Sequence, residues 1–333
     1  MNARGDPWVA PTQTVIAFQG TVSSWWAKIA VGPRNSEPNG GTTMRTLLTI
    51  LGLLAASVAL ADTPEYLLSD HNANKVLWVD KDGKVVWDYP AQNSTDCSYL
   101  PNGHILFANR TGATEVTRDK QVVWQWKAKP GEEVYTCQRL DNGDTLVGEL
   151  GAARLIEVAP DGVTIHKEIK LPIPVNMPQH PRFRNARKLA NGHYLFAIMG
   201  NGTVKELDGD GKEVWEATVP GDPFCAVRLP DGHTLVGCAD AHTIQELDAA
   251  GKVVWEVKQN DVPGARLEFV AGLQRLPNGD TVVANYLGHG SIGHGAHVFE
   301  ITPDKKLVWK NDEQKAIQAV ASCCLIGVEG VVR

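Results

Sequence analysis

The sequence lacks the basic excess and the basic clusters that nucleic-acid-binding surfaces carry. Its 333 residues include 32 Lys and Arg against 38 Asp and Glu, for a formal net charge of −6, so we expect no nucleic-acid partner. Beyond residue 62 it also lacks apolar runs with helical spacing and any run long enough to span a membrane. These absences argue against a helical bundle, while 43% hydrophobic residues are enough to bury a large core.

A targeting signal is confined to one stretch near the amino terminus. Residues 44–61 have a basic start, an apolar run and the small-residue ending Ala59-Leu60-Ala61, which are the three parts of a secretory signal peptide. Residues 1–43 lack periodicity and are rich in Gly, Pro, Asn and Thr, so they are predicted to be a disordered upstream extension. We therefore expect a folded domain over 62–333 that is secreted or periplasmic after cleavage near Ala61.

An internal repeat dominates the rest of the chain. A turn unit of the form Leu-x-Asn/Asp-Gly recurs at intervals of 40 to 49 residues, and it is followed by a Glu between apolar residues, a second turn and, except in the third unit, a Val-Trp pair. Repeats of this length with two hairpin turns are typical of β-propeller blades. The leucines of the turn unit are Leu100, Leu140, Leu189, Leu229 and Leu276, and the tryptophans are Trp87, Trp124, Trp215, Trp255 and Trp309.

The repeat predicts six blades of four antiparallel strands. Five units are complete, and a first, partial unit begins with residues 65–68, which match the second strand of the other units. The stretch 321–326 follows the last Trp unit and is suited to supply the missing innermost strand. Such a strand closes the ring and removes the open edges of the first and last blades. We expect an all-β, six-bladed β-propeller closed by the carboxy-terminal strand.

Two short stretches carry a resemblance to known propellers. The segments DGDGKEVWE (208–216) and DAAGKVVWE (248–256) resemble the repeats of PQQ-like β-propellers, and the Asn-Gly and Gly-x-x-x-Trp units are similar to those of bacterial arylsulfotransferase-like propellers. The resemblance covers residues 65–326. These groups include quinoprotein dehydrogenases, assembly scaffolds and sulfotransferases, so it implies a fold and leaves the function open. Quinoprotein enzymes typically have eight blades, which six repeat units do not provide.

Three insertions interrupt the repeat, at residues 170–185, 257–272 and 286–297. In a four-stranded blade, the connection to the next blade and the loop between the second and third strands share a face. All three insertions are therefore expected at one mouth of the central channel. Long loops on a rigid scaffold are where binding usually resides, so we expect a protein or small-molecule ligand at this mouth.

Histidines and arginines in these insertions are the candidate site residues. The Gly-rich loop carries three histidines that could hold Zn²⁺ or act as a base, although their spacing matches no strong metal motif and incidental histidines are the alternative. Guanidinium groups suit carboxylate, sulfate or phosphate, although pairing with acids such as Glu268 is the alternative. The candidate metal ligands are His289, His294 and His297, and the candidate ligand-binding residues are His180, Arg182, Arg184, Arg187, Asp261, Arg266, His289 and His294.

Residues that recur in every blade are assigned to architecture, because a site breaks a repeat. They are the tryptophans and Glu115, Glu157, Glu206, Glu246 and Glu300. Among the cysteines, Cys225 and Cys238 flank a hairpin and form a candidate disulfide. The others are expected near the channel as buried thiols, with an inner metal-binding thiol ring as the alternative; they are Cys97, Cys137, Cys323 and Cys324.

Two classes of function follow from these patterns. We favour a non-catalytic exported propeller that binds a ligand or partner through its loop-rich face, because no nucleophile–base arrangement stands out from the repeat. The alternative is an enzyme at the His/Arg mouth, either a sulfotransferase or hydrolase or a PQQ-dependent oxidoreductase. No cofactor is assigned, and Zn²⁺ or PQQ with Ca²⁺ are the candidates.

Overall fold

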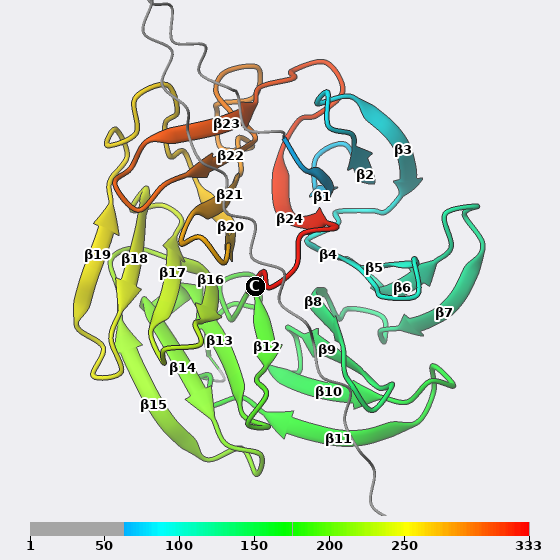
Figure 1. The fold of residues 1–333 in the computed structure, drawn as a ribbon. Helices are drawn as coiled ribbons and strands as arrows, with labels where there is room; N and C mark the ends of the chain where they lie inside the picture. Colours follow the sequence, from blue (N-terminus) through cyan, green and yellow to red (C-terminus); the bar gives the residue numbers. More distant parts are fainter. Residues whose placement is uncertain (1–62, 175, 333) are drawn as a thin grey trace, which may run out of the picture. The chain divides into compact units, whose positions relative to one another are not determined.

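The computed structural model describes residues 63–174 and 176–332. They form six four-stranded antiparallel sheets arranged in a ring, which is a six-bladed β-propeller (Figure 1). The described part holds one 3₁₀ turn, η1 (Met199–Asn201), and no helix that is long and apolar enough to cross a membrane. The predictions for residues 1–43 and for the signal segment 44–61 lie outside the described residues.

Each blade runs from an innermost strand at the channel to an outermost strand at the rim. From inside to outside the first three blades are β24 (Val320–Ile326), β1 (Glu65–Asp70), β2 (Lys75–Val79) and β3 (Val85–Pro90); β4 (Asp96–Tyr99), β5 (Ile105–Asn109), β6 (Gly112–Val116) and β7 (Val122–Lys127); and β8 (Val134–Arg139), β9 (Thr145–Glu149), β10 (Arg154–Val158) and β11 (Ile165–Lys170). The other three are β12 (Ala186–Lys188), β13 (Tyr194–Ile198), β14 (Thr203–Leu207) and β15 (Glu213–Thr218); β16 (Pro223–Arg228), β17 (Thr234–Cys238), β18 (Thr243–Leu247) and β19 (Val253–Val257); and β20 (Val270–Arg275), β21 (Thr281–Asn285), β22 (Val298–Ile301) and β23 (Leu307–Asn311).

The ring is closed by the carboxy-terminal strand, as predicted. Strand β24 pairs antiparallel with β1, with Leu67 opposite Cys324 and Leu68 opposite Cys323. The first blade therefore joins both ends of the propeller domain in one sheet, and β1 is paired on both of its edges.

The hairpin turns form where Asn-Gly and Asp-Gly were expected to place them. Gly103 and Gly232 have φ values of 82° and 90°, a left-handed conformation that glycine adopts without a Cβ clash. The preceding Asn102 and Asp231 accept a hydrogen bond from the backbone N–H two residues on, at 3.0 Å in both cases. These local contacts reverse the chain between the first and second strands of their blades.

The inner and middle strands are buried on both faces, because every blade packs between two neighbours. Consecutive residues of β17 show this: Leu235 packs in one cluster with Leu273 and Phe299 of the next blade, whereas Val236 packs in another with Leu195 and Val204 of the preceding blade. Successive side chains of a strand point to opposite faces, so a continuous apolar run is needed here. This explains strands such as TLVGC that show no polar alternation.

The repeated tryptophans join neighbouring blades, which confirms their architectural assignment. The indole N–H groups of Trp87, Trp124, Trp215 and Trp255 donate to backbone carbonyls in the outer turn of the next blade, at 2.7 to 3.1 Å. Each bond lies between residues at least 31 positions apart, so the contact is tertiary. Trp309 differs, because its indole donates to Glu300 of its own blade at 2.6 Å.

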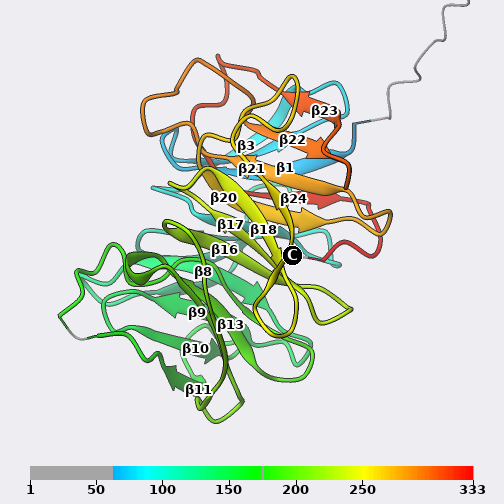
Figure 2. The ribbon, with the colours of Figure 1, turned by 90° about the vertical axis from the view of Figure 1, so that its left-hand side faces the viewer.

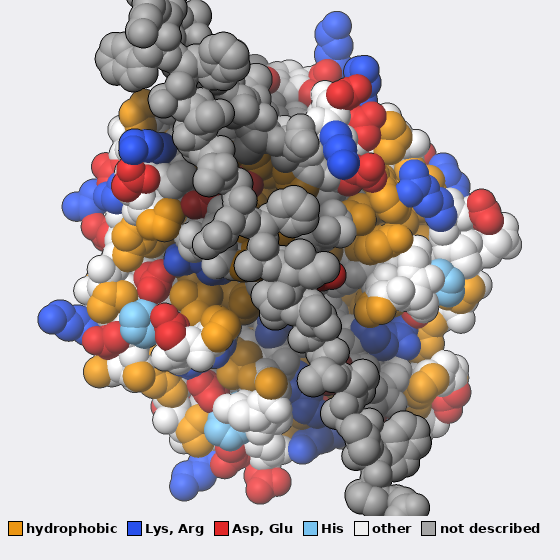
Figure 3. Space-filling model, in the orientation of Figure 1, with side chains coloured by type: hydrophobic (Ala, Val, Ile, Leu, Met, Phe, Trp, Pro, Cys, Tyr) orange, Lys and Arg blue, Asp and Glu red, His pale blue; other side chains and the backbone are white. Residues whose placement is uncertain are grey.

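The repeated glutamates also link blades, on the side of the short turns. Glu206 accepts from His193 of its own blade at 2.6 Å and from Arg228 of the next blade at 2.5 Å. The same arrangement recurs in other blades with the interblade pairs Glu115–Arg139, Glu157–Lys188 and Glu246–Arg275. Figure 3, which views this side, shows histidines beside acidic side chains around the face.

The two sides of the ring differ in the length of their loops. Figure 2 shows the ring edge on, with the short turns on the right and the long connections on the left, among them the loop between β21 and β22. The insertions 170–185, 257–272 and 286–297 each send a residue to one shared pocket, which confirms that they lie at the same mouth. We call this side the loop side and the opposite one the turn side.

Candidate functional site

Six equivalent positions, one from each blade, surround the channel on the loop side. In four blades the residue at this position is bulged out of the inner strand, because the register shifts past Tyr135, Phe224, Ala271 and Ala321. Bulges re-aim side chains and are common next to sites. With Thr95 and Asn185 directly before β4 and β12, these six residues line one narrow cavity of about 20 Å³.

A second pocket lies over this ring, at the mouth. It has a volume of about 70 Å³ and shares Thr95, Tyr135, Phe224 and Ala321 with the cavity below. Its other lining residues come from the loops, and they are His71, His180, Arg184, Met199, Phe269, Tyr286 and His289.

Arg184 is the buried cation of this mouth pocket. Its side chain is 1% exposed, and its guanidinium carbon lies 4.4 Å from the ring centre of Tyr135 and 5.4 Å from that of Phe224. It donates to the Phe183 carbonyl at 3.0 Å and to His180 Nε2 at 3.1 Å. Among the described residues, no carboxylate lies within ion-pair distance of it. Burial lowers its pKa, yet a guanidinium stays charged at neutral pH.

Two buried polar atoms of the pocket have no hydrogen-bond partner among the described residues, Arg184 Nε and Thr95 Oγ1. Buried polar groups are nearly always paired, and leaving one unpaired costs about 1–3 kcal/mol, more for a charged group. Both side chains line the same mouth pocket. A bound group with acceptor atoms would satisfy them.

Two histidines of the pocket are held in the neutral form. Burial lowers the pKa of His71, and the nearby Arg184 charge lowers it further. The pKa of His180 is lowered in the same way, by burial first and then by Arg184. Both are therefore uncharged imidazoles at neutral pH.

Aromatic rings form the apolar wall of the pocket. Phe269 packs edge-on against Phe224 at 5.3 Å and against Tyr286 at 5.6 Å between ring centres. His289 covers both Phe269 and Tyr286, at 4.7 Å and 5.2 Å. Such T-shaped contacts fix the rings and leave a flat apolar surface beside the buried guanidinium.

The cavity below the pocket is closed by an ion pair. Arg187 makes a bidentate contact with Asp96, at 2.8 Å and 2.9 Å, across blades two and four. The Asp96 carboxylate also accepts from Thr136 Oγ1 at 3.0 Å and from the Cys137 N–H at 3.1 Å. The Asp96 carboxylate is well hydrogen-bonded, although Arg187 Nε has no partner among the described residues. The pair ties inner strands together across the channel.

The structure divides the candidate residues predicted from the sequence. His180, Arg184 and His289 line the mouth pocket, whereas Arg187 is committed to Asp96. Arg182 donates to backbone carbonyls, one of them that of Met177 at 3.1 Å. Asp261 and Arg266 are in ion pairs with partly buried partners: Asp261 binds Lys305 at 2.7 Å, and Arg266 lies 3.4 Å from Glu268.

The three histidines of the Gly-rich loop do not converge, so the described residues give no support to a metal site there. His289 lies at the pocket rim, His294 is exposed outside it, and His297 is fully buried. The loop between β21 and β22 carries them in different directions because its glycines at 290, 293 and 295 all have positive φ.

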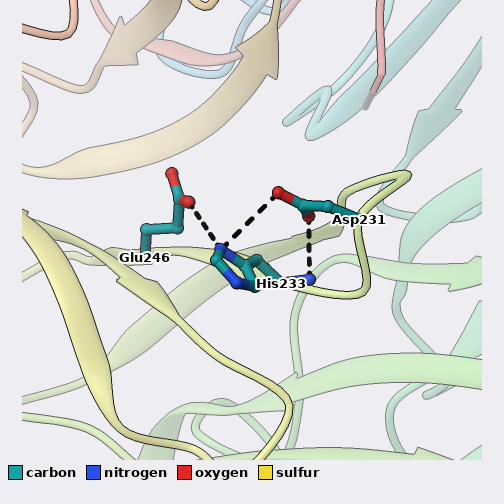
Figure 4. Close-up of side chains that lie close together, drawn as sticks. All are labelled: Asp231, His233 and Glu246. Atoms are coloured by element: carbon teal, nitrogen blue, oxygen red, sulfur yellow. Dashed lines mark hydrogen bonds and ion pairs between the residues drawn. The ribbon is translucent and has the colours of Figure 1, made fainter.

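One group of potential metal ligands does converge in the part of the chain that the structure describes, Asp231, His233 and Glu246 (Figure 4). His233 Nδ1 lies 2.9 Å from Glu246 and 3.6 Å from Asp231. Arg275 of the next blade also binds Glu246 at 2.8 Å. This is the repeated interblade contact of the turn side, and its geometry is explained by ion pairing.

The candidate disulfide is wrong. The cysteines of the chain, all within the described residues, form no disulfide. Cys225 is opposite Gly237, and Cys238 is opposite Pro223, so their side chains point to opposite faces of the blade. They accordingly pack in different interblade clusters, and burial raises both thiol pKa values to about 12.

Sequence reasoning missed the pocket residues that lie outside the insertions. His71 is in the short β1–β2 turn, and Tyr135 and Phe224 begin inner strands. For Tyr135 and Phe224 the available signal was positional, since the equivalent residues of the other blades are small or polar: Thr95, Asn185, Ala271 and Ala321.

The fold is a six-bladed propeller with a pocket at the mouth of its channel on the loop side. The chain belongs to the Mal s 1 allergenic protein-like family, whose pattern matches residues 68–284. No curated protein matches the sequence. The PQQ-like and arylsulfotransferase-like resemblance is not confirmed at the level of the family.

Solved structures share the propeller. A protein of unknown function from Bacteroides caccae is 29% identical with a TM-score of 0.72, over 79% of this chain and 99% of that one. Streptogramin B lyase is 17% identical with a TM-score of 0.54, over 78% and 86%. A catalytically inactive virginiamycin B lyase from Staphylococcus aureus with quinupristin is 16% identical with a TM-score of 0.53, over 77% and 86%. The two lyases show likeness of fold alone.

Proposed function

We propose that this protein is a binding propeller that holds a small organic anion with an apolar body in the mouth pocket of its loop side. The observation that carries the proposal is the buried guanidinium of Arg184, which lacks a carboxylate partner among the described residues. A carboxylate or similar anion would supply that charge, and its apolar part would pack on Phe224, Phe269 and Tyr286.

The pocket suits a ligand with one anionic group, because the positive charge of the pocket is confined to Arg184. Arg184 is the cation of the mouth pocket, and its neighbours His71 and His180 are neutral. Burial also strengthens the attraction, since a charge pair in a low-dielectric site is screened less than one at the surface.

A matched pair of ligands tests the proposal. In isothermal titration calorimetry, 3-phenylpropionate is expected to bind about 10- to 100-fold more tightly than its neutral amide, because a hydrogen bond to a charged group contributes roughly 1.5–3 kcal/mol. Arg184→Gln should remove this preference, and Arg266→Gln, which changes an exposed arginine, should keep it. Equal binding of acid and amide would contradict the proposal. A chelator should leave binding unchanged, because the proposed contacts need no metal.

A catalytic role is the second candidate, and the neutral imidazole of His71 beside a guanidinium favours it. Such a pair can move a proton while the cation stabilises developing negative charge. Incubation with quinupristin, the compound found with the virginiamycin B lyase, tests it by chromatography and mass spectrometry. A product that forms with the unaltered chain and not with His71→Phe would replace the binding proposal by an enzymatic one.

We also propose that the propeller is exported. Residues 44–61 carry the three parts of a signal peptide. Amino-terminal sequencing of the protein from the extracytoplasmic fraction should give Asp62 as the first residue. Recovery of the uncleaved chain from the cytoplasm would contradict export.

A further inference from the structure

A polar lobe opens from the mouth pocket. It has a volume of about 190 Å³ and shares His71, Tyr135 and His180 with the pocket. Its other lining residues are Asn93 and the ion pair of Arg110 with Glu133, whose atoms lie 2.6 Å apart. Because that pair is internally neutral, the lobe favours an uncharged polar group.

The two histidines of the lobe present opposite hydrogen-bonding character. An arginine N–H can only donate, so the contact between Arg184 Nη2 and His180 Nε2 at 3.1 Å makes Nε2 the acceptor. The proton of neutral His180 is then on Nδ1, which is a donor.

His71 has the complementary arrangement. Its Nδ1 lies 3.3 Å from Asn72 Oδ1, an atom that can only accept, so the proton is on Nδ1 and Nε2 keeps its lone pair. Tyr286 donates to the same Asn72 oxygen at 3.1 Å, which orients the amide. His71 therefore offers an acceptor where His180 offers a donor.

The turn that carries His71 is held rigidly. The buried carboxylate of Asp70 accepts from the backbone N–H groups of Ala73, Gln318 and Ala319, at 3.0, 2.7 and 3.1 Å. The His71 N–H in turn donates to the Ala319 carbonyl at 2.9 Å. A ring fixed by its own turn and by Asn72 is preorganised for a directional contact.

We propose that the lobe binds a ligand hydroxyl group that donates to His71 Nε2 and accepts from His180 Nδ1–H, so that the ligand class is a hydroxylated aryl anion. A hydroxyl both donates and accepts, which matches this donor–acceptor pair. The inference rests on the proposed anion site, because Arg184 sets both the position of the ligand and the tautomer of His180.

The test compares two probes that differ by one hydroxyl, 3-phenyllactate and 3-phenylpropionate, in calorimetry with the full chain at pH 7.5. One enantiomer of phenyllactate is expected to bind about tenfold more tightly than phenylpropionate. His71→Phe should remove this advantage, so that the variant binds both probes with the same affinity. His294→Ala changes an exposed histidine of the same side and should alter neither.

The outcomes separate the two proposals. Equal binding of the two probes, with both weakened by Arg184→Gln, would overturn the hydroxyl site and leave the anion site standing. Failure of both probes to bind would overturn both. If the His71 variant does not fold, the comparison of the two probes on the unaltered chain is sufficient to test the hydroxyl site.

Discussion

On the turn side of the ring, carboxylates of four blades are held by cations of the next blade, whereas on the loop side the buried cation Arg184 has no carboxylate within ion-pair distance among the described residues. The turn side repeats the same contact, as in Glu206–Arg228 and Glu246–Arg275. The mouth pocket draws residues of different types from all six blades. Repetition serves the assembly of the ring, and departure from it marks the place where the ring can bind something else.

Two arginines of one segment show the same contrast at close range. Arg187 is buried and bound by both guanidinium N–H groups to Asp96, whereas Arg184, three residues earlier, is equally buried and meets only a carbonyl, an imidazole and two aromatic rings. The first stabilises the channel. The second is a cost to stability that a ligand would relieve.

The largest expected change in the free energy of unfolding is for substitution of Arg187. Arg187→Met leaves the buried Asp96 carboxylate without its cation and should lower the free energy of unfolding by about 3–5 kcal/mol, measured by urea denaturation. Arg266→Met, at an exposed position, should change it by about 0.5 kcal/mol or less. A decrease in the free energy of unfolding below about 1 kcal/mol for Arg187→Met would contradict the structural role that distinguishes Arg187 from Arg184.

A smaller, pH-dependent effect on stability is expected where the last blade meets the first. Glu300 occupies the repeated glutamate position, but no described cation pairs with it, since the adjoining β24 ends in Ile326. Burial and the neighbouring Asp280 raise its pKa from 4.5 to about 7. Because the folded state then binds more protons than the unfolded chain between these values, stability should fall as pH rises from 4.5 to 7 and level off above.

Glu300→Gln should remove that slope, because an amide does not titrate there. Thermal unfolding followed from pH 4.5 to 8 should show the variant more stable by on the order of 1 kcal/mol at pH 8, after allowance for solvent screening. Glu206→Gln, which loses the ion pair with Arg228, should be less stable at pH 8. An unchanged slope in Glu300→Gln would show that this carboxyl does not set the pH dependence.

The smallest expected change in the free energy of unfolding is for substitution of Arg184. Arg184→Met should leave the free energy of unfolding without ligand unchanged within about 1 kcal/mol or raise it, since it replaces an unpaired buried charge by an apolar chain. Urea denaturation beside Arg187→Met makes the comparison direct. A loss above about 2 kcal/mol would mean that Arg184 has a structural role that its visible contacts do not explain.

Much of the site could be predicted, because the insertions mark the functional side. His180, Arg184 and His289 lie in them and do reach the pocket. Nothing in the local sequence separates Arg184 from Arg187, since the partner of Arg187 is 91 residues away. Nor does spacing show that His297 turns inward while His294 stays exposed.

What the sequence by itself determined is the scaffold. Hairpin turns, strand composition and the period of the repeat are local properties, and together they predict six blades and their closure. Only the tertiary structure decided which polar side chains are satisfied and which are not. Pairing across the channel depends on positions far apart in the chain and on one-residue bulges, as at Tyr135 and Phe224, which redirect a side chain without any change in composition.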